Sequence, residues 1–142
     1  MKKSIFASMV LVFTIALTSC NSMKKVSSTD GLTNNEWELA TLNGAEPNRT
    51  EDFLNGLPYL NFTKDNSVNG SSGCNRLFGP YDLKANGEIK LDKMGMTRMA
   101  CPGKGESKFM QALNKVTSLK IKKNKLVLME GTNEVITMTP KK

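Results

Sequence analysis

Hydrophobic and polar residues alternate over short stretches through most of the second half of the chain and part of the first. The first such runs are residues 36–42, residues 58–63, and a segment around Val68 that follows a polar turn at residues 64–67. In the earliest run Trp37, Leu39 and Thr41 occupy every second position. This two-residue period is typical of a strand with one buried face, so each run predicts a short strand.

A hairpin and a three-strand meander are predicted further along the chain. Asn86-Gly87, within a turn at residues 84–87, is the strongest short hairpin signal, and it lies between runs at residues 79–83 and 88–93. Three more alternating runs, at residues 118–123, 125–130 and 134–139, are separated only by short polar turns. Neighbouring strands joined by such turns pair as an antiparallel meander.

Residues 105–116 follow a different period. Phe109, Ala112, Leu113 and Val116 recur at i, i+3, i+4 and i+7, which is the apolar stripe of an amphipathic helix. One helix among many antiparallel strands predicts a single small α+β domain. We expect a strongly curved antiparallel sheet or partial barrel, with the helix packed on it.

The start of the chain indicates export. Lys2 and Lys3 precede an apolar run from Ile5 to Leu17, which is shorter than the roughly 20 residues of a membrane-spanning helix. A basic start followed by such a run predicts a secretory signal peptide. The run ends at Leu17-Thr18-Ser19-Cys20, which resembles the lipobox of bacterial lipoproteins.

The lipobox resemblance implies that residues 1–19 are removed and that Cys20 carries a diacylglycerol and an amide-linked acyl chain, such as palmitate. Two acyl chains anchor a protein firmly to a membrane. Asn21, rather than Asp, follows the lipidated cysteine, which implies the outer membrane of a bacterial envelope. Residues 20–34 are then the lipidated cysteine and a flexible polar tether, and residues 35–142 a single domain.

Charge narrows the class of partners. The chain has a net charge of +7, and removing Lys2 and Lys3 with the leader lowers it by two. The excess is concentrated late in the chain, at Lys104, Lys108, Lys115, Lys120, Lys122, Lys123 and Lys125. Such a run is usually a solvated face, and the alternative is attraction to other envelope proteins or anionic envelope components. Nucleic acid is not expected, because aromatic residues do not alternate with the lysines. We expect a monomer.

Histidine is absent from the whole sequence. This absence excludes Cys-His and Ser-His-Asp nucleophile systems and every histidine metal ligand. No catalytic, metal-binding or cofactor-binding residue is predicted, and we expect the protein not to be an enzyme.

Two cysteines remain once Cys20 is lipidated, Cys74 and Cys101. An even pair in an exported protein predicts a disulfide, which would stabilise the fold by roughly 3–4 kcal/mol. Two separately buried thiols are the structural alternative. A redox role, with Arg76 and Arg98 favouring a thiolate, is a third interpretation, but the Cys-x-x-Cys spacing is lacking. Two cysteines fall short of a zinc site.

Methionines gather near the second cysteine, at Met94, Met96 and Met99. Their thioether sulfurs are ligands for Cu(I). Methionine is also a common core filler, and core packing is the preferred interpretation.

Two motifs carry a family resemblance. Ser72-Gly73-Cys74-Asn75 and Thr97-Arg98-Met99-Ala100-Cys101-Pro102, in that order, resemble the META/HslJ domain (DUF306) of bacterial envelope lipoproteins. The resemblance extends from about Asn34 to Thr139. It implies one small mixed β domain with a single helix, and a loose association with heat-shock or envelope stress and with resistance to some compounds. It implies no agreed reaction or ligand.

The glycine-rich motif allows two interpretations. Glycines around Cys74 permit a bend or a close approach of strands, with Asn75 bonded to its own loop backbone. Alternatively, Asn75, Arg76 and Arg98, with Thr97 beside them, form a polar cluster that recognises a peptide, glycan or lipid. The leading hypothesis is a lipid-anchored, non-enzymatic envelope protein of undefined molecular activity. A ligand-binding or inhibitor module at the glycine-rich motif is the alternative.

Overall fold

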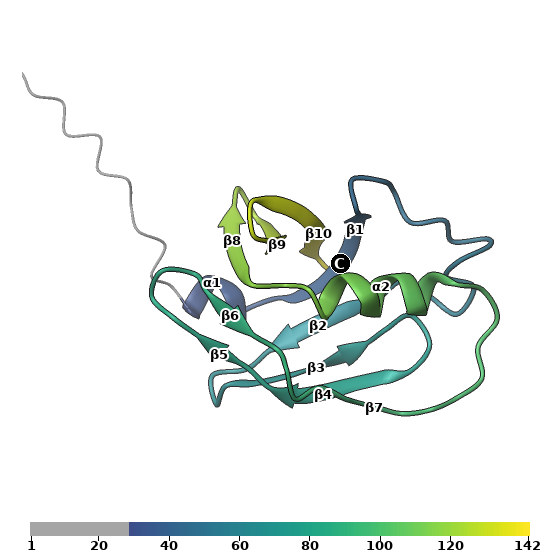
Figure 1. The fold of residues 1–142 in the computed structure, drawn as a ribbon, viewed down its shortest axis with the longest axis horizontal. Helices are drawn as coiled ribbons and strands as arrows, with labels where there is room; N and C mark the ends of the chain where they lie inside the picture. The colour runs from purple at the N-terminus through teal and green to yellow at the C-terminus, as the bar shows by residue number, and fades with distance from the viewer. Residues whose placement is uncertain (1–28) are drawn as a thin grey trace, which may run out of the picture.

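The computed structural model describes residues 29–142, which form two helices and ten strands (Figure 1). The helices are α1 (Thr29–Thr33) and α2 (Gly105–Leu113). The strands are β1 (Glu36–Leu42), β2 (Tyr59–Phe62), β3 (Ser67–Ser71), β4 (Arg76–Pro80), β5 (Asp82–Leu83), β6 (Ile89–Lys90), β7 (Gly95–Met96), β8 (Ser118–Lys122), β9 (Lys125–Glu130) and β10 (Asn133–Pro140). Within these residues no helix has the length and apolar character needed to cross a membrane. The predicted leader and Cys20 lie outside the described residues.

Eight of the strands form one antiparallel sheet in the order β7-β4-β3-β2-β1-β10-β9-β8. The first and last strands, β1 and β10, pair near its middle. β5 and β6 form a separate hairpin, and an isolated bridge between Glu88 and Ser118 connects that hairpin to β8. In residues 29–142 the sheet is not closed into a barrel. The prediction of a small, mostly antiparallel domain is confirmed, whereas strong curvature or a partial barrel stays a prediction.

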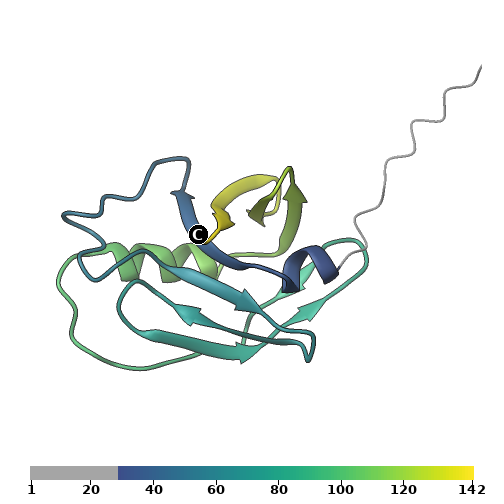
Figure 2. The ribbon, with the colours of Figure 1, turned by 180° about the vertical axis from the view of Figure 1, so that it is seen from behind.

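The helix α2 lies over one face of this sheet (Figures 1 and 2), and side chains of both contribute to the core. Trp37, Phe62 and Phe109 are fully buried, and α2 also buries Ala112 and Leu113. The predicted apolar stripe of the helix is therefore confirmed. All hydrophobic core residues of the described region lie between Leu32 and Met138. A chain that begins at Asn21 consequently keeps this entire core.

One bulge changes which residues of β1 face inward. Trp37 and Leu39 are buried as predicted, but the pairing of β1 with β10 shifts between Leu39 and Thr41. An extra residue in one strand reverses the alternation beyond it. Leu42 is buried instead of Thr41.

The described fold begins before residues 34 and 35, where the boundary between tether and domain is predicted. Residues 29–33 form α1, and Leu32 is 1% exposed within the core. The indole Nε1 of Trp37 donates a hydrogen bond of 2.9 Å to the carbonyl oxygen of Leu32. Burial and this bond hold a helix too short to be stable by itself.

The hairpin and the meander are confirmed, but the strand predicted at residues 79–83 is divided. Pro80 ends β4 and Asp82 begins β5, so the chain leaves the large sheet between them. The turn after β5 contains Gly87 with φ +88°, the left-handed conformation that favours glycine. β6 then pairs back on β5, as Asn86-Gly87 predicts.

Candidate functional site

The glycine-rich loop between β3 and β4 is tightly closed. Ser72 and Asn75 are the buried polar residues of the described region, at 0% and 2% exposure. The backbone N–H of Ser72 donates to the carbonyl oxygen of Asn75 at 2.8 Å, and the N–H of Asn75 donates to Ser72 Oγ at 3.0 Å. Gly73 has φ +98°, and a Cβ there would lie 2.8 Å from the ring of Phe53. A side chain at position 73 would therefore strain the loop.

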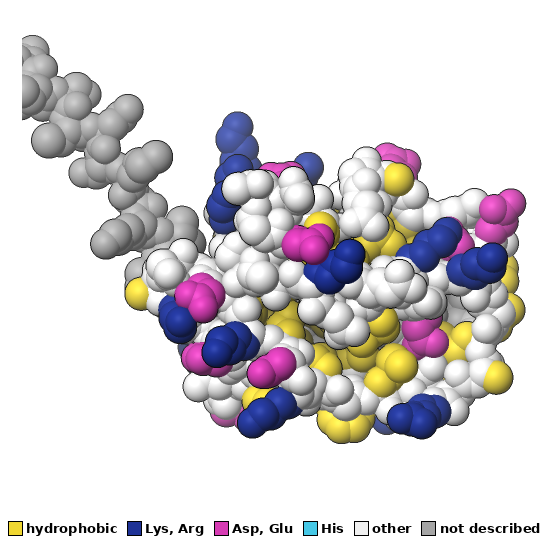
Figure 3. All heavy atoms as spheres, viewed as in Figure 1, with side chains coloured by type: hydrophobic (Ala, Val, Ile, Leu, Met, Phe, Trp, Pro, Cys, Tyr) yellow, Lys and Arg dark blue, Asp and Glu magenta, His cyan; other side chains and the backbone are white. Residues whose placement is uncertain are grey.

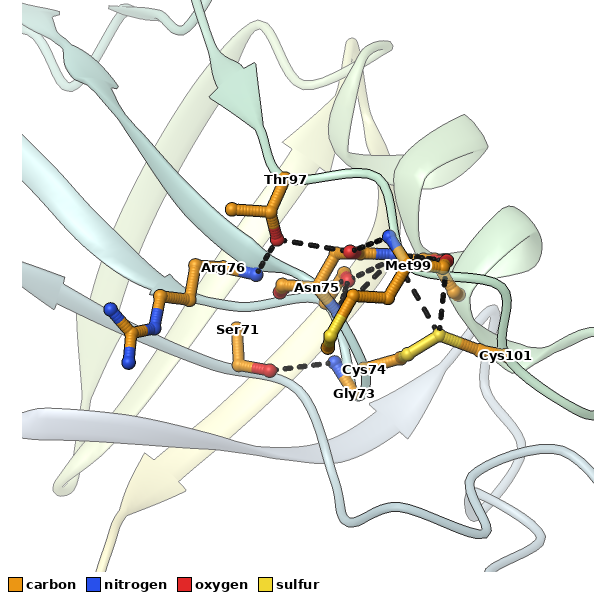
Figure 4. Close-up of a disulfide and its surroundings, with 10 residues drawn as sticks. Ser71, Gly73, Cys74, Asn75, Arg76, Thr97, Met99 and Cys101 are labelled. Atoms are coloured by element: carbon orange, nitrogen blue, oxygen red, sulfur yellow. Dashed lines mark hydrogen bonds between the residues drawn. A yellow bond between two sulfur atoms is a disulfide. The ribbon is translucent and has the colours of Figure 1, made fainter.

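The Asn75 side chain joins this loop to the segment after β7. Its Oδ1 accepts hydrogen bonds from the Thr97 hydroxyl at 2.9 Å and from the Met99 N–H at 2.7 Å. Its Nδ2 donates to the Met99 carbonyl oxygen at 3.1 Å. Figure 4 shows these bonds converging on Asn75 from the segment at residues 97–101. The expected bonding of this side chain to its own loop is wrong, because its partners belong to another segment and to α2.

Glu106, in the first turn of α2, is the third member of the site. Its carboxylate accepts hydrogen bonds from the Ser72 hydroxyl and from Asn75 Nδ2, the latter at 3.0 and 3.1 Å. The amide of Asn75 thus uses both its donors and its acceptor capacity. Sequence reasoning missed this role of Glu106. The available signal was its isolation as the one acid among the late lysines.

The structure joins Cys74 to Cys101 by a disulfide, with the two Cα atoms 6.3 Å apart. This separation lies within the usual range for disulfides. Asn75 Nδ2 lies 3.7 Å from the Cys101 sulfur, so the disulfide and the asparagine hold the same segment. Potential ligand atoms of Cys74, Cys101 and Glu106 lie within 4.8 Å of one another. The sulfurs are bonded to each other, however, and offer no thiolate to a metal in this state.

The predicted cluster of Asn75, Arg76 and Arg98 is not formed in the described structure. Both arginines are exposed, and the Arg76 side chain points away from Asn75 (Figure 4). Only the backbone of Arg76 takes part, donating from its N–H to Thr97 Oγ1 at 3.0 Å. The structure therefore brings Asn75 and Thr97 together and leaves both guanidinium groups on the surface. The Asn75 amide is almost fully buried, and its donors and acceptor are engaged within the protein.

A groove lies beside the segment that follows β7. It has a volume of about 480 Å³ and is lined chiefly by Phe78, Leu91, Met94, Met96, Met110 and Arg98. Figure 3 shows apolar side chains in the hollow below α2. A second hollow of about 420 Å³ adjoins it and shares Leu91, Asp92 and Asn114. We call the first of these hollows the methionine groove.

Two of the four exposed large hydrophobic residues in the described region, Phe78 and Met96, line the methionine groove. Phe78 is 54% exposed, Met96 37% and Met99 60%; the fourth is Leu54. Core packing is thus wrong for Met96 and Met99, whereas Met94 is partly buried and packs against the core. The Phe78 ring covers Gly95, its partner across β4 and β7. Flexible thioethers at a surface adapt to varied apolar partners.

The chain is similar to known proteins in both sequence and fold. The META domain family matches residues 30–142. A search of curated proteins found no match. Among solved structures, a protein determined by NMR has a TM-score of 0.61 and 22% identity, covering 77% of this chain and 91% of its own.

Two further structures show the same fold. One is an NMR structure of a protein from Burkholderia xenovorans, with a TM-score of 0.58, 22% identity, and coverage of 78% of this chain and 83% of that one. The other is the crystal structure of a DUF4847 family protein from Bacteroides vulgatus, with a TM-score of 0.56, 17% identity, and coverage of 76% and 93%. These likenesses concern the fold alone. With the family match over residues 30–142, they lead to one identification: the chain belongs to the META domain family.

Proposed function

We propose that this META domain protein is a lipid-anchored, non-enzymatic component of the bacterial envelope that binds extended peptide segments of other envelope proteins. The observation that carries the binding role is the pair of exposed hydrophobic side chains, Phe78 and Met96, on the lining of the methionine groove beside the open sheet edge at β7. Exposed apolar side chains that gather at a groove rimmed by polar residues support an interaction surface.

The sheet edge at β7 suits an extended peptide. β7 is the terminal strand of the large sheet, so one side of its backbone has no neighbouring strand in residues 29–142. An extended peptide can add to such an edge through backbone hydrogen bonds, and alternate side chains then enter an adjoining pocket. The methionine groove supplies that pocket. Asp92 and Arg98 on its lining offer one charge of each sign, which suits a peptide better than an anionic lipid or a neutral glycan.

The opposite edge of the sheet differs from β7. Its terminal strand, β8, carries exposed Lys120 and Lys122, and the bridge at Ser118 covers its beginning. Lysines on an edge strand oppose pairing with another chain. The β7 edge carries apolar residues in the corresponding places. This contrast supports a binding role for one edge only.

The anchoring part of the proposal is supported by the sequence alone. Lys2, Lys3, the apolar run to Leu17 and the lipobox-like ending at Cys20 favour export and acylation. The outer-membrane location and the link to heat or envelope stress and compound resistance follow from the lipobox and family resemblances. Intact mass of protein extracted from membranes tests the acylation directly.

A non-enzymatic role is supported by the chemistry of the glycine-rich loop between β3 and β4. The chain contains no histidine, and its described cysteines are bonded to each other. The Glu106 carboxylate and the Asn75 amide are engaged in mutual hydrogen bonds. The Ser72 hydroxyl donates to the Glu106 carboxylate, but Ser72 is 0% exposed, so its oxygen is closed to a substrate in this structure. We therefore propose the methionine groove, rather than the surroundings of Asn75, as the ligand-binding site.

Peptide binding is tested by NMR on the chain from Asn21 to Lys142 with labelled methionine methyl groups. The probe is a short peptide of alternating valine and threonine with serine-rich ends. We expect shifts for Met94, Met96 and Met110 but none for Met138, which is buried in the core. A matched peptide with two adjacent central prolines, which lacks backbone donors on both edges, should bind far more weakly.

A pair of variants provides the protein-side control. Met96→Glu places a charge in the methionine groove and should abolish the shifts, whereas Leu54→Glu changes an exposed hydrophobic residue outside the groove lining and should preserve them. Equal binding of the proline peptide, or equal loss in both variants, would refute edge-strand recognition.

A further inference from the structure

The β8–β9 hairpin carries a dense positive charge. Lys120, Lys122, Lys123 and Lys125 are all exposed. No carboxylate lies within ion-pair distance of these four among the described side chains, whereas Lys108 pairs with Asp52. We call these four residues the lysine hairpin. Figure 3 shows basic side chains projecting at the top of the molecule, over this hairpin.

The lysine hairpin retains two unfavourable local features. Lys122 and Lys125 are paired directly across β8 and β9, and like charges in that position destabilise a sheet. Lys123 has φ +44° and Asn124 φ +66°, so a lysine occupies a turn position that favours Asn or Gly. Backbone strain of this kind is typically kept at functional sites.

Protection of the sheet edge explains only part of this charge. Lys120 and Lys122 lie on the edge strand β8, where lysines prevent pairing with other chains. Lys123 is in the turn, and Lys125 belongs to β9, which is an inner strand. Edge protection therefore does not account for the charge at these two positions.

The position of the hairpin indicates which partner. In Figures 1 and 2 the lysine hairpin and α1, where the described chain begins, lie at the same end of the molecule. Eight residues, 21–28, separate Cys20 from Thr29. An acylated Cys20 would therefore hold this end within about 30 Å of the bilayer surface, the reach of that segment when fully extended. The methionine groove is lined by β7, which is the terminal strand of the large sheet opposite to β8 in the strand order.

We propose that the lysine hairpin docks on the anionic phospholipid headgroups of the membrane that holds the chain. This placement rests on the anchoring part of the proposed function; the affinity for anionic lipid does not. Lysine ammonium groups and lipid phosphates attract each other at the surface, within the roughly 10 Å over which charge is unscreened in dilute salt. Docking at two points, the acyl chains and the hairpin, fixes the orientation of the domain.

The test uses the unacylated chain from Asn21 to Lys142, sedimented with vesicles of phosphatidylglycerol and phosphatidylcholine. We expect binding to vesicles containing phosphatidylglycerol, weakening as salt rises, and little binding to phosphatidylcholine alone. The variant Lys122→Gln, Lys123→Gln, Lys125→Gln keeps Lys120 as edge protection. Each lysine contributes about a five-fold change in partitioning, so this variant should bind about a hundred-fold more weakly.

The matched control removes the same charge elsewhere. Lys90, Lys93 and Lys104 are exposed and lie outside the hairpin, and their combined change to Gln should alter binding only slightly. Equal loss in both triple variants would show attraction by net charge and overturn the inference, as would binding to phosphatidylcholine alone. Inorganic phosphate should not compete at matched ionic strength, and specific competition would overturn the lipid assignment.

The acylation measurement separates the two proposals. If the native protein is acylated but the unacylated chain does not bind anionic vesicles, the lysine-hairpin inference is overturned and the anchoring proposal stays intact. Selective vesicle binding by a chain whose native form lacks acyl groups supports the hairpin's lipid affinity and refutes the anchor.

Discussion

Replacing Asn75 by alanine should destabilise the fold by about 3 kcal/mol. The Nδ2 bond to the Glu106 carboxylate involves a charged acceptor and contributes about 1.5–3 kcal/mol. The two bonds accepted by Oδ1, from Thr97 and Met99, contribute about 1 kcal/mol each. Water can reach part of the freed segment, since the Met99 side chain is 60% exposed, and this recovers about 1 kcal/mol.

The assay is equilibrium unfolding in urea of the oxidised chain from Asn21. A loss of about 3 kcal/mol is a large part of the 5–15 kcal/mol that stabilises a typical domain. The midpoint should fall while the slope against urea stays constant, because the surface exposed on unfolding hardly changes. Asn69→Ala, an exposed asparagine on the adjoining strand β3, is the matched control and should change stability little.

The isosteric variant Asn75→Asp tests the same contact through the pH dependence of stability. Aspartate keeps the shape but removes the donors and places a carboxylate against Glu106. Two adjacent carboxylates raise the pKa of their shared proton in the folded state. The variant should therefore be closest to the parent at acidic pH and lose stability as pH rises through that raised pKa. A loss below about 1 kcal/mol for Asn75→Ala, or a pH-independent Asp variant, would refute the role assigned to Asn75.

Three other outcomes follow from the same structure. Changing Cys74 and Cys101 together to serine should cost roughly 3–4 kcal/mol in urea unfolding, and an unchanged midpoint would contradict a stabilising disulfide. Gly70→Ala should largely unfold the domain, measured by circular dichroism, because its Cβ would overlap a backbone oxygen of β2; Gly131→Ala, which meets no atom, should cost only about 1 kcal/mol. Burial raises the pKa of Tyr81 above its ordinary value of 10.0, so stability should be complete below pH 10 and fall above it. A melting curve against pH for Tyr81→Phe should lack that fall, and an identical fall in both proteins would rule the tyrosine out.

Most strands could be predicted from the sequence because their pattern is local. Alternation in residues 36–42 and the turn signal Asn86-Gly87 act over a few residues, and both predictions match the structure. The bulge after Leu39 could not be predicted, because it depends on the register with β10, nearly a hundred residues away. α1 depends likewise on burial of Leu32 against the core rather than on helix propensity.

The motifs of the candidate site could be predicted from the sequence, but the contacts between their side chains could not. Cys74, Asn75 and Thr97 stand in the two recognised motifs, and the structure brings them together. Glu106 was not among the predicted residues, since its bonds to Asn75 span 31 positions and its position in the first turn of a helix has a sufficient local explanation. Arg76 and Arg98 were included in the predicted cluster because guanidinium groups recognise carboxylates. Side-chain direction, which sequence spacing does not determine here, leaves them exposed.

The glycine-rich loop between β3 and β4 helps to hold β7, the strand that lines the methionine groove. β7 is only two residues long, too short to be held firmly by its pairing with β4 alone. The segment that follows it is fixed by Asn75 through Met99 and by the disulfide at Cys101. This bracing keeps the edge strand in place while its outer side stays open to a peptide. With the lysine hairpin of β8 and β9 against a bilayer, as proposed above, we expect the β7 edge to stay accessible to a peptide, because β7 and β8 are the two opposite terminal strands of the large sheet.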